Sequence, residues 1–278
     1  MDYKMLVCDI DGTLLDSNSQ LAPQVIEAIR EAHKQGVVIT LASGRPLRGV
    51  VPIARQLGVN VPVILGNGAL IVDPLKQETL LHRGLDEATT HAILDVIAAH
   101  RQWAGVFTHA FEGIDTYYDR HPGHREALLF VNKDPQVSQQ VESLKQIAHL
   151  DPIKVLSIEK TESVKGLVQD LRSLAEERKF NFLSFDHDFP GFTFLECFER
   201  EATKARAIHH LARELGIARE QIVTVGDNLN DLEMVEYAGL GVAMGNAVPE
   251  LRAKADWQTT TNDEYGVAHL IRERILTR

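Results

Sequence analysis

Two aspartates lie two residues apart in the segment CDIDGT, at the end of an apolar run near the start of the chain. In an extended segment, residues two apart point to the same side, so the carboxylates of Asp9 and Asp11 are expected to face one spot. Two anions held that close repel each other unless a cation lies between them. Mg²⁺ is bound by one or two carboxylates together with water and phosphate oxygens. The pair therefore predicts a site for a hard cation beside a phosphate.

A second acidic pair follows another apolar run, in the segment VGDNLND. Asp227 stands at the end of an expected buried strand, where aspartate is disfavoured, and Asp231 comes four residues later. If this segment only had to cap the following helix, Asn228 or Asn230 would suffice. The two acids therefore predict further metal coordination, from a ligand and from a group that supports the ligands.

Two other segments offer groups that bind anions. Thr203 is expected to cap a helix, which places Lys204 in the first turn, where a cation opposes the helix dipole. An anion bound at that helix start would remove the conflict. In the segment SGR, the hydroxyl of Ser43 and the N–H groups after it can bind a phosphate, and Arg45 can fork onto a phosphate or a carboxylate.

These groups together fit the transfer of a phosphoryl group, which needs neutralised phosphoryl oxygens and an in-line nucleophile. An aspartate with an ordinary pKa of about 3.9 is ionised at neutral pH and can attack without a base. A second carboxyl can donate a proton to the leaving alcohol and then take one from water. The two neighbouring aspartates near the start of the chain are the candidates for these two roles.

The elements around these segments must bring them to one place. Residues 5–10 are expected to form a strand buried on both faces, residues 22–36 an amphipathic helix, and residues 37–42 a second strand. A strand, a helix and a strand with short connections form a βαβ unit, so the strands are expected to be parallel. Ligands bind at the carboxyl ends of strands in an open parallel sheet, and all four polar segments fall at that end of the expected sheet.

The pattern changes from about Gly84 and returns to alternating strands and helices at Thr203. The fold class expected is α/β, a Rossmann-like doubly wound parallel sheet with an inserted α+β section. The expected domains are a core of residues 1–83 and 199–278 and an insertion of residues 84–198. Within the insertion, residues 134–150 are expected to form a helix.

Composition limits the classes of partner. The chain has 278 residues, 44% of them hydrophobic, and a formal net charge of −10, which disfavours binding to nucleic acid backbones. A small anionic ligand remains compatible with this charge, because a metal ion can reverse the local field. The expected partner is a small phosphorylated molecule, with no nucleic acid and no membrane, and the expected state is a monomer or small homo-oligomer.

The expected location is the cytoplasm. The N-terminal segment has charges at Asp2 and Lys4 and only a short apolar run, unlike a signal peptide. No apolar stretch approaches the roughly 20 residues of a membrane helix. Cys8 and Cys197 lie far apart in apolar stretches, which predicts buried, reduced thiols.

The four polar segments resemble, in order, the four motifs of the haloacid dehalogenase superfamily. DIDGTL resembles the first motif, LASGR the second, Lys204 the third and GDNLND the fourth. The NGA at residues 67–69 and the stretch GVAMGNAVPELRAKADWQTTTNDEYGVAHLI at residues 241–271 are typical of its Cof-like phosphatase branch. The resemblance rests on motifs at both ends of the chain. In the middle of the chain it rests only on the order of the expected helices and strands.

The resemblance implies a Mg²⁺-dependent phosphatase that forms an aspartyl-phosphate. It implies that Asp9 is the nucleophile and that Asp11 is the acid/base. The metal would be held by Asp9, by the backbone carbonyl of Asp11 and by Asp227, with Asp231 in support. The groups implied to hold the phosphate are Ser43, Lys204, Asn230 and the backbone around Ile10 and Gly44. The inserted section would be a mobile cap that closes over the site and selects the substrate.

The substrates expected are small phosphate monoesters, with sugar phosphates preferred and phosphorylated vitamins or nucleotides as alternatives. Arg45 is a candidate contact to the substrate. A sugar phosphomutase would use the same aspartyl-phosphate. A phospho-acceptor signalling module would share the acidic pocket, hydroxyl and lysine, but such modules are shorter and have no large inserted domain.

Overall fold

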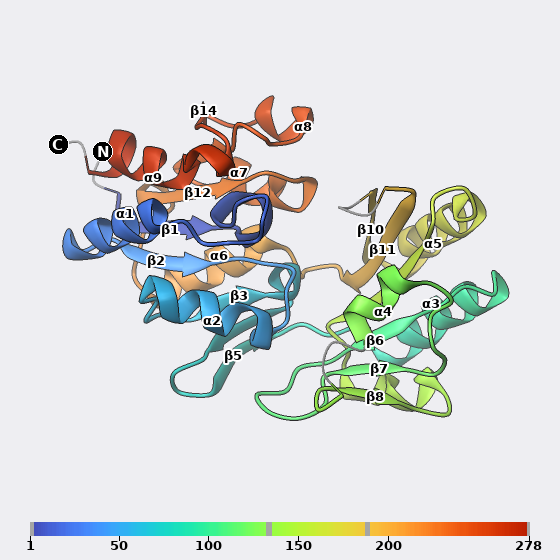
Figure 1. The fold of residues 1–278 in the computed structure, drawn as a ribbon. Coiled ribbons are helices and arrows are strands. Elements are labelled where there is room, and N and C mark those ends of the chain that lie inside the picture. The colour runs from blue at the N-terminus through green and yellow to red at the C-terminus, as the bar shows by residue number, and fades with distance from the viewer. Residues whose placement is uncertain (1–2, 132–134, 187–189, 277–278) are drawn as a thin grey trace. The chain divides into compact units, whose positions relative to one another are not determined.

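The computed structural model describes residues 3–131, 135–186 and 190–276. Its contacts divide the chain into two compact units, each with its own sheets. The first unit contains Met1–Leu81 and Thr203–Arg278, and the second contains His82–Ala202. Figure 1 colours the chain from its N-terminus to its C-terminus, and both ends of the sequence contribute to the first unit.

The first unit is built on a five-stranded parallel sheet in the order β14-β13-β12-β1-β2. Its strands are β1 (Met5–Cys8), β2 (Val38–Leu41), β12 (Ile222–Gly226), β13 (Leu240–Ala243) and β14 (Trp257–Gln258). All four residues of β1 are fully buried, as expected of a strand whose sheet is covered on both faces. The prediction of an α/β fold with a parallel sheet is confirmed.

Helices cover this sheet, and their apolar residues recur at helical spacing. They are α1 (Pro23–Lys34), α2 (Leu47–Leu57), α6 (Lys204–Glu214), α7 (Leu232–Tyr237), α8 (Pro249–Arg252) and α9 (Gly266–Leu270). In α1, the buried residues Val25, Ala28, Ile29 and Ala32 lie on one face, while the charged residues of the helix lie elsewhere. Helix α1 packs against α2, α9 and β2.

A small second sheet in this unit has the order β3-β4-β5. Its strands are β3 (Val63–Leu65), β4 (Leu70–Asp73) and β5 (Glu78–His82). Strands β3 and β4 are antiparallel and are joined by a tight turn at Gly66–Gly68. The turn contacts helix α6, and therefore reaches the region where the polar segments gather.

The second unit contains a six-stranded sheet in the order β10-β11-β9-β6-β7-β8. Its strands are β6 (Gly105–Phe107), β7 (Thr116–Tyr118), β8 (Ser138–Gln140), β9 (Lys154–Lys160), β10 (Phe180–Asp186) and β11 (Phe192–Glu199). Its helices are α3 (Glu87–Ala99), α4 (Arg125–Val131) and α5 (Lys165–Arg178). Ile93 and Ile97 of α3 pack with Leu167 and Leu171 of α5 over one face of the sheet.

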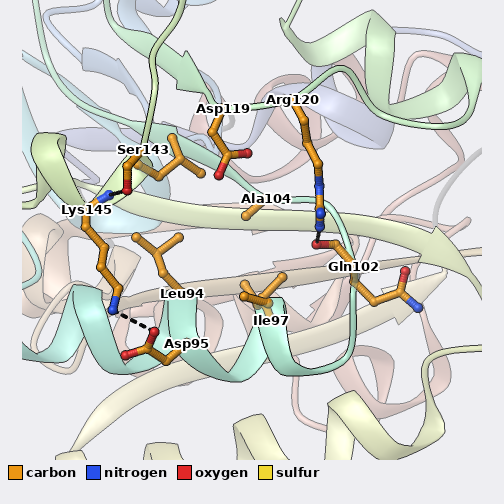
Figure 2. A pocket seen from close by; sticks show the side chains of 11 residues that line it. Leu94, Asp95, Ile97, Gln102, Ala104, Asp119, Arg120, Ser143 and Lys145 are labelled. Carbon is orange, nitrogen blue, oxygen red and sulfur yellow. Dashed lines mark hydrogen bonds and ion pairs between the residues drawn. The ribbon is translucent and has the colours of Figure 1, made fainter.

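A small pocket of about 140 Å³ lies beside α3 in this unit (Figure 2). Leu94, Ile97 and Ala104 are among its apolar lining residues. At its rim, Lys145 Nζ lies 2.6 Å from Asp95 Oδ1. The guanidinium of Arg120 donates to the backbone carbonyl of Gln102. These cationic groups are therefore already paired within the protein.

The helix predicted at residues 134–150 is wrong. Residues 138–140 form strand β8, which pairs in parallel with β7, and Leu144–Leu150 is a 3₁₀ segment. The apolar residues of this stretch recur at a spacing that suits a helix, but the carbonyl of Val137 accepts from Asp115 and Thr116 in the neighbouring segment. Pairing with a distant strand thus overrides the local pattern. Helix α4 and strand β14 were not predicted.

Among the described residues, no helix combines the length and apolar character required to cross a membrane.

Candidate active site

Lys204 connects two of the predicted acidic segments. Its side chain is buried, with 1% of its surface exposed. Its Nζ donates to Asp9 Oδ1 at 2.5 Å and to Asp231 Oδ1 at 2.6 Å. Asp9 follows β1 and Asp231 follows β12, so the lysine ties together loops that are far apart in the sequence. Such a buried ion cluster persists only if each charge keeps its partner.

The start of helix α6 holds Lys204 in place. The predicted cap is confirmed, because Thr203 Oγ1 accepts from the backbone N–H of Arg206 at 3.3 Å. The turn at Gly66–Gly68 lies directly against this helix start. A Cβ at Gly68, whose φ is +104°, would come within 2.2 Å of the carbonyl oxygen of Thr203. Glycine is therefore required at residue 68 for the turn to approach the helix.

The first acidic loop packs on the Asp227 carboxylate. The hydroxyl of Thr13 donates to Asp227 Oδ1 at 2.7 Å. Gly12 has a φ of +74°, and a Cβ there would come within 2.4 Å of Asp227 Oδ2. Carboxylate oxygens of Asp9, Asp227 and Asp231 lie within 4.8 Å of one another. The structure therefore places three acids from two loops in one largely buried cluster that could hold a metal ion.

Asp231 is held on both sides. Its Oδ1 accepts from Lys204, and its Oδ2 accepts from the backbone N–H groups of Asp227 at 2.9 Å and Asn228 at 3.0 Å. Its side chain is fully buried. Both oxygens of Asp231 are thus engaged within the protein, and they fix the backbone that carries Asp227.

Asp11 is not part of this cluster, contrary to the expectation that it shares one spot with Asp9. Its carboxylate is about half exposed and is paired with the guanidinium of Arg45, whose Nε donates to Oδ2 at 2.7 Å. The reason is local, because the strand ends at Cys8 and Ile10, between the two acids, has helical backbone dihedrals, so the alternation of side chains does not extend to Asp11. Asp11 therefore has a different cation for a partner.

The second motif segment lies beside the turn at Gly66–Gly68. Ser43 is buried, and its Oγ accepts from the backbone N–H of Arg45 at 3.1 Å. A Cβ at Gly44 would come within 2.9 Å of Asn67 Oδ1. The same Asn67 oxygen accepts from Asn230 Nδ2 at 3.0 Å. Ser43, Gly44 and Asn230 are therefore brought close together through Asn67.

Burial changes the acidity of the clustered groups. It raises the pKa of Asp9 well above its usual range, against the attraction of Lys204 and together with repulsion from Asp231 and Asp227. Burial and repulsion from Asp231 also raise the pKa of Asp227 to about 7, against the hydrogen bond from Thr13. Burial alone would lower the pKa of Lys204, but its two carboxylate partners outweigh that effect and raise it.

A divalent cation fits this imbalance of charge. Three carboxylates lie close together, only two of them bonded to Lys204, and carboxylate oxygens are the ligands that Mg²⁺ prefers. A cation bound by Asp9 and Asp227 would offset the repulsion that raises both pKa values.

We expect Mg²⁺ to raise the melting temperature more at about pH 8 than at about pH 6. The pKa values of Asp9 and Asp227 are raised in the folded state, so their contribution to stability is greatest below the unfolded carboxylate pKa of about 4. It is lost as pH rises through the folded value, near 7 for Asp227. At high pH a cation therefore relieves repulsion, whereas at low pH protons already do so.

Thermal melting of the protein with and without Mg²⁺, recorded at both pH values, measures this difference. In Asp227→Asn, most of the difference between the Mg²⁺-induced shifts at the two pH values should disappear, because the variant removes a carboxylate that binds either a proton or the cation. Equal shifts at the two pH values in the unaltered protein would contradict the assignment.

Several residues that shape the site were not predicted. Thr13 bonds Asp227, and Asn67 bonds Asn230 through its side chain and Ser43 through its backbone. Asn246 donates to the carbonyl of Gly12. In the sequence, the NGA at residues 67–69 and the GNA at residues 245–247 are typical of a family but predict no contact. Their contacts join separate loops, so the spacing of residues within either segment does not predict them.

Comparison with known proteins agrees with this geometry. A model of the haloacid dehalogenase-like hydrolases matches residues 6–271. Phosphatase YwpJ of Bacillus subtilis is 33% identical over 288 residues, which cover 97% of this chain and 99% of that protein. 5-Amino-6-(5-phospho-D-ribitylamino)uracil phosphatase YitU of the same organism is 26% identical over 270 residues, covering 97% and 96%.

A solved structure has the same fold. The crystal structure of a haloacid dehalogenase-like hydrolase from Bacteroides thetaiotaomicron aligns with a TM-score of 0.82 at 27% identity, covering 98% of this chain and 99% of that one. The matching family model spans nearly the whole sequence, and the relatives are named phosphatases. The predicted family is therefore confirmed, and the protein belongs to the haloacid dehalogenase-like hydrolases, in their Cof-like phosphatase branch.

Proposed function

We propose that this phosphatase hydrolyses small phosphate monoesters with the help of Mg²⁺, through a phosphoryl group carried on Asp9. The observation that supports this proposal most is the contact of Lys204 with both Asp9 and Asp231, beside Asp227, at the carboxyl ends of β1 and β12. A buried carboxylate held by a buried ammonium is shielded from water and can meet a phosphorus atom directly.

The reaction proposed has two halves. In the first, a carboxylate oxygen of Asp9 attacks phosphorus, the bond from phosphorus to the ester oxygen breaks, and Asp11, as general acid, gives a proton to the leaving alcohol. In the second, Asp11 takes a proton from water as the water attacks phosphorus. The bond between phosphorus and Asp9 then breaks, inorganic phosphate leaves, and Asp9 is restored. The exposure of the Asp11 carboxyl suits an exchange of protons with substrate and water.

The groups proposed to hold the phosphate come from all four motif segments. They are the side chains of Ser43, Lys204 and Asn230 and the backbone around Ile10 and Gly44. Asp9, Asp227 and the backbone carbonyl of Asp11 would hold Mg²⁺, with Asp231 in support. When bound, the ion would neutralise charge on the phosphoryl oxygens. The close packing of these loops around Asn67 and Gly12 supports a preformed site.

Sugar phosphates are the substrates proposed first, with phosphorylated vitamins or nucleotides as alternatives. The relative named for 5-amino-6-(5-phospho-D-ribitylamino)uracil supports a small phosphorylated metabolite. The unit of residues 82–202 is proposed to be a mobile cap that selects the substrate, and Arg45 a contact to it. We further propose a monomer or small homo-oligomer in the cytoplasm, where the free thiols of Cys8 and Cys197 would stay reduced.

Removing divalent cations with EDTA is expected to stop the release of inorganic phosphate, and added Mg²⁺ to restore it, because the crowded carboxylates would otherwise repel an anionic substrate. Phosphate release should be assayed across a panel of sugar phosphates, nucleotides and phosphorylated vitamins. Undiminished turnover after thorough chelation would refute the metal requirement.

The same assay separates the alternatives. A phosphomutase would convert one sugar phosphate into an isomer and release little phosphate. A signalling module would accumulate a long-lived aspartyl-phosphate, whereas a phosphatase turns it over rapidly. Rapid release of phosphate without an isomeric product is the expected result.

A further inference from the structure

Two asparagine side chains hold the loop that follows Asp9. Asn246 lies after β13, and its Nδ2 donates to the carbonyl oxygen of Gly12 at 2.8 Å. Asn262 lies after β14, and its Nδ2 donates to the carbonyl oxygen of Leu15 at 2.9 Å. The two asparagines are joined, because the backbone N–H of Asn262 donates to Asn246 Oδ1 at 3.0 Å. We call this linked pair the asparagine clamp.

The segment around Asn246 also holds the fourth motif. The N–H of Met244 donates to the carbonyl of Gly226 at 3.0 Å, and the N–H of Val248 donates to the carbonyl of Asp227 at 2.9 Å. Residues 244–248 therefore touch both acidic loops, one through a side chain and the other through the backbone. One short segment thus relates the two loops to each other.

The hydrogen bond from Asn246 reaches Gly12, the residue of the loop with the greatest backbone freedom. Glycine has no Cβ and many accessible backbone conformations, so a hydrogen bond from outside the loop helps to select one. The peptide that follows Gly12 leads into Thr13, whose hydroxyl donates to Asp227. A rotation of that peptide would withdraw the Thr13 hydroxyl and alter the closest approach between Gly12 and Asp227.

The chemistry of residue 246 suits this task. The amide of asparagine has a donor and an acceptor, and here it uses both, the donor toward Gly12 and the acceptor toward Asn262. An aspartate of the same shape could accept from Asn262 but could not donate to a carbonyl. Because Asn246 is exposed, water competes for its hydrogen bonds, so it adds more to the geometry of the loop than to overall stability.

We infer that Asn246 and Asn262 are positioning residues, which set the Gly12–Thr13 backbone and through it the place of Asp227 among the metal ligands. This inference rests on the proposed function, since it assumes that the acidic cluster binds Mg²⁺. It assigns a role to two residues outside the four motif segments, neither of which is proposed to touch the substrate.

The test compares Asn246→Asp, Asn246→Ala and Asn262→Ala with Asn60→Asp, a matched change at an exposed residue of the same unit. Mg²⁺ alone is titrated into each protein by calorimetry, and kcat, KM and the metal-free melting temperature are measured with p-nitrophenyl phosphate as substrate. We expect Asn246→Asp to lower Mg²⁺ affinity and kcat about tenfold to a hundredfold, with KM and melting temperature unchanged. Asn60→Asp should change none of these.

The aspartate variant separates geometry from charge. Its added negative charge would by itself attract Mg²⁺, so weaker binding would come from the changed contact with the Gly12 carbonyl. Unchanged or tighter Mg²⁺ binding in Asn246→Asp and Asn246→Ala would overturn the inference, as would a loss of activity that merely follows a loss of melting temperature. If the unaltered protein neither binds nor needs Mg²⁺, the proposed function itself fails.

Discussion

Replacing Asp9 with asparagine is expected to lower the release of phosphate by about 10⁴-fold or more, as loss of a nucleophile does in other enzymes. The amide keeps a carbonyl oxygen that can accept from Lys204, but it has no anionic oxygen to attack phosphorus. The fold should survive, because Lys204 keeps Asp231 as a charged partner while one of three crowded carboxylates is removed. We therefore expect an inactive protein whose melting temperature is equal or higher.

The measurement is phosphate release from p-nitrophenyl phosphate together with a thermal melt. Glu233→Gln is the matched control, since it removes one exposed negative charge from the same unit and should leave turnover unchanged. Acid quenching with labelled substrate should trap a protein-bound phosphoryl group in the unaltered chain and none in Asp9→Asn. Retained turnover in Asp9→Asn would remove Asp9 from the role of nucleophile.

Lys204→Met is expected to have the largest effect on stability. Its ammonium is the buried partner of both Asp9 and Asp231, and methionine keeps the length of the side chain but not the charge. Breaking a buried ion pair by removing one partner costs about 3–5 kcal/mol, because the other charge is left uncompensated. Activity should also vanish, since Asp9 would then take up a proton and lose its nucleophilic oxygen.

The change in the free energy of unfolding is measured by urea denaturation. Lys254→Met is the matched control, because Lys254 pairs with Glu236 at the surface, at 3.0 Å with both side chains about half exposed. An exposed pair of this kind contributes less than about 1 kcal/mol. The double variant Lys204→Met with Asp231→Asn should recover part of the lost stability. Equal losses for Lys204→Met and Lys254→Met would contradict the view of Lys204 as the centre of the cluster.

The parallel sheet could be predicted because its signals are local. The apolar runs at residues 5–10 and 37–42 with a helix between them define a βαβ unit, and β1 and β2 form as expected. Strand β14 could not be predicted, since two residues carry no periodicity. The stretch at residues 134–150 was misread because its hydrogen bonds go to β7, which lies elsewhere in the sequence.

The meeting of Asp9, Lys204, Asp227 and Asp231 could be predicted because each lies at the end of a strand or the start of a helix, where a parallel sheet gathers its loops. The direction of the Asp11 side chain could not, since it depends on the helical turn at Ile10, which ends the alternation of the strand. The asparagine clamp was equally hidden, because it acts on backbone carbonyls, which every residue type presents alike.

The order of the strands has a consequence for synthesis of the protein. Strand β1 is synthesised long before β12, one of its two partner strands, in which Ile222 pairs with Met5. At about 5–20 residues per second, the ribosome leaves that edge of β1 unpaired for roughly ten seconds or more. Nascent chains therefore expose an apolar strand edge of the kind that chaperones shield. A chain that stops before Lys204 also cannot assemble the buried ion cluster. Phosphatase activity would begin only after the segment that carries Asp227 and Asp231 has been synthesised.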